Sequence, residues 1–188
     1  MYTTILLSSL LATALGAPLV ARQNDTEWQP AEGTAATCDA TADKYISLVI
    51  GPEQGDVIFD HACAGILPAC AYPENLPEGT FCTQTIDFKL GGPKNKTLNA
   101  LVEQKNNHNK LSDWAVNFSV TPAEQPENSA GVFLTKADCK GYFQELLLKT
   151  DPQGCNLQGL GPSAGSLTVG GTSSLKDAVF NVSFVKRT

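Results

Sequence analysis

The chain has 188 residues, with 13 basic against 19 acidic side chains and only two arginines, Arg22 and Arg187. An acidic chain with so few arginines is a poor match for nucleic acid, which proteins bind through clustered Lys and Arg. No apolar run approaches the roughly 20 residues of a membrane-spanning helix, so we expect no membrane span. The length suits one domain, of about 150 residues once an N-terminal leader is set aside.

Residues 1–16 are typical of a secretory signal peptide, because an apolar segment ends in Ala-Leu-Gly, with small residues where signal peptidase cleaves. Residues 17–22 (APLVAR) have the form of a short pro-segment that ends in a basic residue, and residues 23–36 are small and polar, as in a flexible arm. We therefore expect a secreted, extracellular protein, either free or associated with a cell wall. A single disulfide-stabilised domain is predicted at residues 37–188.

The six cysteines are all expected in disulfides, because an even number behind a signal peptide is typical of a secreted disulfide framework. Their spacing does not select a pairing. We favour a bond between Cys139 and Cys155, which would clip a helix to the loop after it. Zinc is not expected, since the sequence has no C-x2-C pair, and we expect no other metal or cofactor. The cysteines are Cys38, Cys63, Cys70, Cys82, Cys139 and Cys155.

The first half of the chain predicts short strands around a long loop. Residues that are β-branched, aromatic or alternating favour strands at 43–50, 56–60 and 83–90. Residues 61–81 contain three prolines and two glycines, which favours an irregular loop held by disulfides. A helix is then predicted to begin at Thr97. Its inner face would be formed by Leu98, Leu101 and Val102.

The second half contains the clearest helix of the chain, at residues 134–149. Thr135 and Asp138 have the spacing of a capping box, and the helix is expected to end before Pro152. One apolar stripe follows the helical period: Cys139, Tyr142, Phe143, Leu146 and Leu147. Strands are predicted at 113–120, 132–134, 166–169 and 178–185.

The order of these elements predicts an α+β fold, in which two helices pack on one face of an antiparallel sheet that disulfides staple. A split β-α-β arrangement is the specific topology that we expect. The last two strands should form an antiparallel hairpin. In the final strand, Phe180, Val182 and Phe184 are expected to face the core.

Four Asn-X-Ser/Thr sequons lie in a chain that carries a secretory leader, which suggests N-glycosylation. A sequon that is used must face solvent, so Asn117 and Asn181 should mark the outer face of their strands. The four positions are Asn24, Asn95, Asn117 and Asn181.

No catalytic residue is predicted. Residues 161–165 (GPSAG) match the nucleophile-elbow pattern, but no helix is predicted after them and no histidine follows Ser163. Paired carboxylates are sufficient for a glycoside hydrolase, so a small secreted hydrolase or lyase is the alternative function. A non-enzymatic protein would instead bind through the central loop, because binding residues concentrate on loops held by rigid scaffolds. The candidate residues are His61, Tyr72, Glu74, Glu78 and Phe81.

The leader, the six cysteines and the sequons resemble small secreted cysteine-rich proteins of filamentous fungi, many of which are candidate effectors or cell-surface proteins. The segment 137–147 (ADCKGYFQELL), followed by Gly154-Cys155, is similar to the cysteine-clipped helix of killer-toxin-like α/β effectors. This resemblance implies a non-enzymatic protein with a role in virulence, which binds a host or competitor protein or a cell-wall glycan. A structural cell-wall protein is the third hypothesis.

Overall fold

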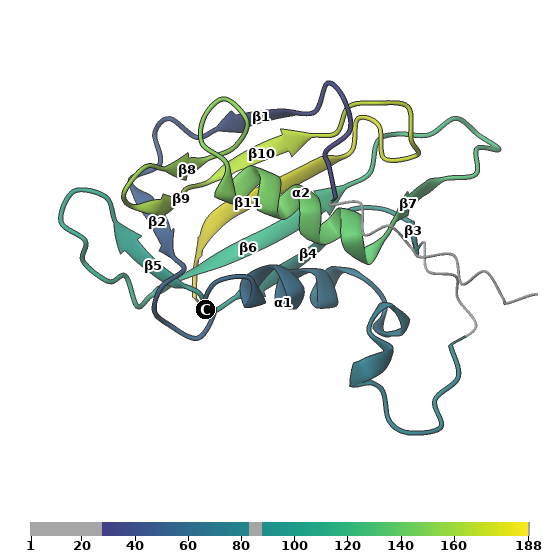
Figure 1. Cartoon of the computed structure of the whole chain (residues 1–188), viewed down its shortest axis with the longest axis horizontal. Helices are drawn as coiled ribbons and strands as arrows, with labels where there is room; N and C mark the ends of the chain where they lie inside the picture. The colour runs from purple at the N-terminus through teal and green to yellow at the C-terminus, as the bar shows by residue number, and fades with distance from the viewer. Residues whose placement is uncertain (1–27, 83–87, 188) are drawn as a thin grey trace, which may run out of the picture.

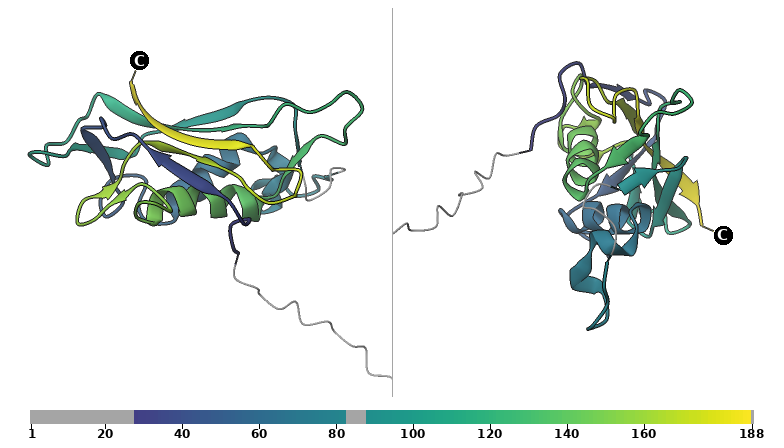
Figure 2. Two further views of the ribbon diagram at one scale, coloured as in Figure 1. Left: turned by 90° about the horizontal axis from the view of Figure 1, so that it is seen from above. Right: turned by 90° about the vertical axis from the view of Figure 1, so that its right-hand side faces the viewer.

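A five-stranded antiparallel sheet forms the centre of the molecule in the computed structural model, which describes residues 28–82 and 88–187 (Figure 1). Two helices, α1 and α2, lie on one face of this sheet (Figure 2), which confirms the predicted fold class. The strands, in their order across the sheet, are β1 (Ala35–Cys38), β10 (Gly165–Thr168), β11 (Val179–Lys186), β6 (Trp114–Thr121) and β4 (Lys94–Leu98).

Outside the central sheet, the chain forms two helices, two 3-10 turns and three short two-stranded ladders among the described residues. The helices are α1 (Val57–Ile66) and α2 (Lys136–Leu148), with 3-10 turns η1 (Ala69–Ala71) and η2 (Pro73–Asn75) after α1. Three two-stranded ladders pair β2 (Lys44–Ser47) with β5 (Leu101–Gln104), β3 (Phe88–Leu90) with β7 (Val132–Leu134), and β8 (Asn156–Leu157) with β9 (Gly161–Pro162). Residues 83–87 of the predicted strand at 83–90 lie outside the described residues.

The predicted split β-α-β unit is formed by β6, α2 and β10. Both β6 and β10 are antiparallel to β11, so they run in the same direction with β11 between them. The chain passes from β6 to β10 by way of α2, and its last strand then inserts between the two. The predicted hairpin of β10 and β11 is therefore also present, and its register pairs Ser166 with Asn181.

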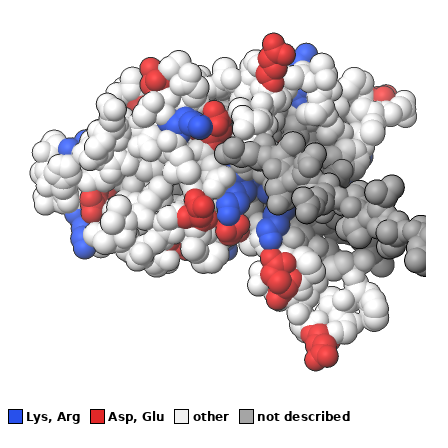
Figure 3. Space-filling model, in the orientation of Figure 1, with Lys and Arg blue, Asp and Glu red and all other residues white. Residues whose placement is uncertain are grey.

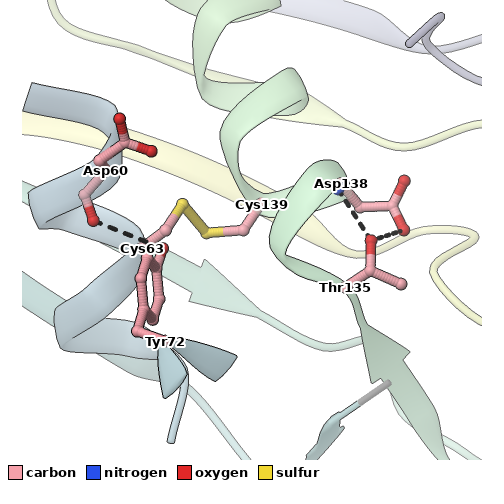
Figure 4. The surroundings of a disulfide bond; sticks show 6 residues. All are labelled: Asp60, Cys63, Tyr72, Thr135, Asp138 and Cys139. Atoms are coloured by element: carbon pink, nitrogen blue, oxygen red, sulfur yellow. Dashed lines mark hydrogen bonds between the residues drawn. A yellow bond between two sulfur atoms is a disulfide. The ribbon is translucent and has the colours of Figure 1, made fainter. Parts of the chain in front are cut away.

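The apolar stripe of α2 provides the main contact between helices and sheet. Phe143 packs edge to face against Phe118 of β6 and Phe180 of β11, with ring centroids 5.1 Å apart in both pairs. All three rings are fully buried, and aromatic pairs of this kind contribute about 0.5–1.5 kcal/mol beyond the burial of their area. The helix begins as predicted, because the Asp138 backbone N–H donates to Thr135 Oγ1 over 2.9 Å (Figure 4).

Two predictions for the first half of the chain are wrong. The predicted strand at 56–60 forms the first turns of α1, and the helix continues to Ile66, within the predicted loop. The apolar residues Ile58, Phe59 and Ala62 repeat at a helical spacing that becomes visible only when the segment is followed past His61. The helix predicted from Thr97 is instead the end of β4 followed by β5, because Leu98 pairs with Val116 in the sheet.

The flexible arm predicted at residues 23–36 is also wrong for its described part, 28–36. The Trp28 ring contacts Tyr142 of α2 edge to face at 4.8 Å between centroids, and its indole N–H donates to the Asp138 carboxylate over 3.0 Å. The absence of a side chain at Gly141 leaves space for the Trp28 ring. A Cβ atom at this position would lie 2.2 Å from the indole and would clash with it. β1 then joins the sheet at Ala35. The predicted signal peptide, the pro-segment and Asn24 lie outside the described residues.

All six cysteines form disulfides, but the pairing that we favoured is wrong. The bonds join Cys38 to Cys155, Cys63 to Cys139, and Cys70 to Cys82. Cys139 lies in the first turn of α2, a helix of 13 residues and therefore about 20 Å long, whereas Cys155 follows its far end. A disulfide requires the two Cα atoms to be about 5.5 Å apart, so Cys139 instead meets Cys63 of α1 in the core (Figure 4).

The Cys63–Cys139 bond should contribute more to stability than the Cys70–Cys82 bond. It joins residues 76 apart in the chain, against 12 for the other bond, and longer loops lose more entropy when they are closed. We expect Cys63→Ala/Cys139→Ala to lower the free energy of unfolding by about 4–5 kcal/mol, and Cys70→Ala/Cys82→Ala by at most about 3 kcal/mol. Urea unfolding of both double variants measures the difference, and equal losses would contradict it.

Candidate binding surface

Residues 68–82, which we call the lobe, project from the C-terminal end of α1 (Figures 1 and 2). The Cys70–Cys82 bond closes the lobe, and η1 and η2 give its first half a regular backbone. The side chain of Phe81 is 92% exposed, the largest exposure of any large apolar residue described. An exposed aromatic ring on a loop with restricted freedom is suited to binding, because little entropy is lost when it inserts into a partner.

The base of the lobe is fastened to α1 and α2 by Tyr72. Its ring is buried, and its hydroxyl donates to the Asp60 carbonyl oxygen over 3.4 Å (Figure 4). The Lys136 ammonium lies 4.0 Å from the centroid of the Tyr72 ring and 2.8 Å from the Glu74 carboxylate. Burial, together with the nearby carboxylates of Asp60 and Glu74, raises the pKa of Tyr72 to about 12. The hydrogen bond from Lys136 lowers the pKa of Glu74.

A hollow of about 420 Å³ opens beside this base. Its wall is mainly apolar, with Ala71, Pro73 and Phe88 among the residues that line it, while Glu74 and Lys136 add one charge of each sign. Acidic and basic side chains also lie next to one another on the face drawn in Figure 3. Between the two helices, Lys140 of α2 pairs with Asp60 of α1 at 3.0 Å. The hollow therefore suits an apolar group with polar neighbours, without a strong preference for either charge.

Four of the five predicted site residues lie on the lobe: Tyr72, Glu74, Glu78 and Phe81. The fifth, His61, is on α1, and its Nδ1 atom lies 2.8 Å from the mostly buried carboxylate of Glu53. Because the Tyr72 ring is buried, Tyr72 has a structural role at the base of the lobe. Phe81 and Glu78 are exposed. Sequence reasoning missed Lys136, because it lies 62 residues from Glu74 and no local pattern links the two.

A second hollow, of about 360 Å³, contains two carboxylates and an aromatic ring. It is lined by Asp56, Glu145 and Trp28, and the Gln144 amide donates to the Asp56 carboxylate over 3.4 Å. Two carboxylates beside an aromatic ring are the groups that a retaining or inverting glycosidase uses. This site was not predicted, because Trp28 lies in the segment that was expected to be a flexible arm.

The elbow-like segment 161–165 has no catalytic geometry. Ser163 is buried, and its hydroxyl donates to the Lys44 carbonyl oxygen over 3.1 Å. The segment belongs to β9 and the start of β10, so a strand and not a helix follows the serine. Within residues 28–82 and 88–187, no three His, Cys, Asp or Glu side chains are grouped closely enough to hold a metal ion. In the same residues, no helix has the length and apolar character needed to span a membrane.

Comparisons with protein-family models, with curated proteins and with solved structures find no match to this chain.

Burial of the Tyr72 phenol should make stability depend on pH in alkaline solution. The folded protein keeps this proton up to about pH 12, whereas an unfolded chain releases it near the ordinary pKa of 10.0. The free energy of unfolding should therefore fall as pH rises from about 10 to 12. Urea unfolding at several pH values should show a smaller fall for Tyr72→Phe than for the unchanged protein. An identical pH dependence in the two proteins would contradict the burial of this hydroxyl.

Proposed function

We propose that this chain is a secreted, cysteine-rich protein that acts by binding an extracellular protein, in the manner of an effector, through the lobe at residues 68–82. Phe81 is the observation that carries this proposal, since its ring is 92% exposed on a loop that a disulfide closes. Aromatic side chains at the centre of an interface commonly contribute most of its binding energy. Three disulfides are compatible with an extracellular location.

A protein partner fits the lobe better than a cell-wall glycan. Glycan sites usually present aromatic rings beside several hydrogen-bonding groups, whereas Phe81 is the one aromatic ring that is exposed on the lobe. The hollow at the base is lined mainly by apolar residues, such as Ala71, Pro73 and Phe88, and can accept an apolar side chain. The resemblance to secreted fungal effectors agrees with this choice.

Replacing Phe81 should weaken partner binding without affecting the fold. We expect Phe81→Ser to reduce retention of a host or competitor protein at least about tenfold, in keeping with an interface hot spot. The matched control is Val49→Ser, because Val49 is 82% exposed and precedes α1, whereas the lobe follows α1. Pull-down from extracellular extracts, with each protein immobilised at equal density, measures retention. Thermal unfolding should be the same for all three proteins, since neither side chain is buried.

Two results would contradict the proposal. The first is equal retention of the partner by Phe81→Ser and by the unchanged protein. The second is retention on chitin, β-glucan or pectin with no protein partner, which would favour the glycan version of the binding function.

A secreted hydrolase or lyase is the second candidate, and the hollow with Asp56, Glu145 and Trp28 is the observation that favours it. In that case one carboxylic acid would protonate the glycosidic oxygen, and the other carboxylate would act as nucleophile or base.

Release of reducing sugars from wall polysaccharides tests this second candidate. If the hollow is catalytic, both Asp56→Asn and Glu145→Gln should lower the rate at least about 100-fold, because each removes a proton-transfer group. Asp177→Asn is the control, because it removes one negative charge at a residue that does not line the hollow. No turnover by the unchanged protein would exclude the hydrolase on the polysaccharides used.

A further inference from the structure

The face of the central sheet opposite the helices has a composition unlike the rest of the surface. Side chains alternate between the two faces of a strand, and Phe118, Phe180 and Leu167 turn inward. Val179 and Val185 lie on the outer face toward the two ends of β11. Between them, Asn, Ser and Thr line up in two rows. The first row is Thr37, Ser166, Asn181, Ser119 and Asn95, and the second is Ser183, Asn117 and Thr97. We call these residues the sequon face.

Three of the four sequons meet on this face, although they are far apart in the sequence. They come from β4, β6 and β11, which are adjacent strands. The register of the three strands places residues of one sequon between residues of the other two. Ser119, from the sequon of Asn117, lies between Asn95 and Asn181, and Asn117 lies between the hydroxyl residues of the other two sequons, Thr97 and Ser183.

This composition is not explained by the requirements of a strand. Asn is depleted in strands, yet it occurs here at three positions close together. None of the residues of the sequon face is charged, in a chain with 19 acidic residues. Among the described residues, no helix covers this side of the sheet (Figure 2). A polar sheet face with three sequons, which no described helix covers, has room for sugar chains at all three positions.

The side chains are placed so that sugar chains can be attached without loss of the sheet. Asn95 is exposed at the edge strand β4, and Asn117 and Asn181 are half-buried. The Asn117 carbonyl oxygen, Oδ1, accepts a hydrogen bond from the Thr97 hydroxyl over 3.2 Å. That bond involves Oδ1 and not the amide nitrogen Nδ2, which is the atom that carries an N-linked glycan.

We propose that the sequon face carries the protein's own N-linked oligosaccharides at Asn95, Asn117 and Asn181, and that these close this face to partners. Partner binding is thereby confined to the helical side and the lobe. The proposal rests on secretion, which is part of the proposed function. In the transfer step, Nδ2 forms a bond to the anomeric carbon of a pyrophosphate-linked oligosaccharide donor. The bond from that carbon to the pyrophosphate oxygen breaks, and the displaced pyrophosphate and solvent take up the amide proton.

Transfer must precede folding at the central position. Neighbouring strands are about 4.8 Å apart, so Asn95 and Asn181 are about 10 Å apart with β6 between them. A transferase has little access to Asn117 once its two cross-strand neighbours, Thr97 and Ser183, are in place. The sugars are therefore added to the unfolded chain and gathered on one face by the pairing of β4, β6 and β11.

Site occupancy is measured on the full chain expressed in a eukaryotic secretory host. Digestion with peptide N-glycosidase converts each modified Asn to Asp, and peptide mapping then identifies it. We expect conversion at two or more of the three positions. A triple Asn→Gln variant at positions 95, 117 and 181 should lose the corresponding mass. Unmodified Asn at all three positions in secreted protein would overturn this inference alone, whereas retention inside the cell with the leader uncleaved would overturn the proposed secretion.

Shielding is measured by labelling with a bulky polyethylene-glycol maleimide. Thr168→Cys places a thiol on the outer face next to Ser166, and Thr150→Cys places one at an exposed residue after α2. We expect the Thr168→Cys protein to react at least tenfold faster after removal of the glycans, and the Thr150→Cys protein to react at the same rate before and after. Equal acceleration of both thiols, or of neither, would show that the sugars do not close this face.

Discussion

Burial of one side of α2 against the sheet is the interaction on which the rest of the structure depends. Phe143 lies between Phe118 and Phe180, and so joins the two longest strands of the sheet, β6 and β11. The same helix face carries Cys139, whose bond to Cys63 holds α1 beside α2. Trp28 then covers the outer surface of α2 at Gly141. One helix thus connects the sheet, the other helix and the segment before β1.

The two sides of the sheet are suited to different tasks as a result. On the helical side, α1 is fixed by the core, and the lobe that follows it is held by Tyr72 and by its own disulfide. Phe81 can therefore be exposed without loosening the fold, because the residues that hold the lobe are at its base. On the opposite side, the sheet presents Asn, Ser and Thr in register, and the proposed glycans would direct partners toward the lobe.

The parts of the fold that follow from local pattern could be predicted from the sequence. The capping residues Thr135 and Asp138 and the stripe ending at Leu147 identify α2, because a helix repeats every 3.6 residues and its period is visible in a segment of that length. β6 and β11 were predicted from strict alternation, since one of their faces is buried and the other is not. Segments that are too short to show a period, such as 56–60 and 97–102, were assigned to the wrong class of element.

Local pattern in the sequence was sufficient to predict that the six cysteines are oxidised in an α+β domain and that α2 buries one stripe. The packing of whole elements sets which cysteines pair and places Lys136 on Tyr72. It also brings Asp56 and Glu145 to one hollow and three sequons to one face of the sheet. The physical reason is distance along the chain. Hydrophobic periodicity and capping act between residues a few positions apart, whereas disulfide partners and strand registers are set by how whole elements pack, and Cys38 and Cys155 meet across 117 residues.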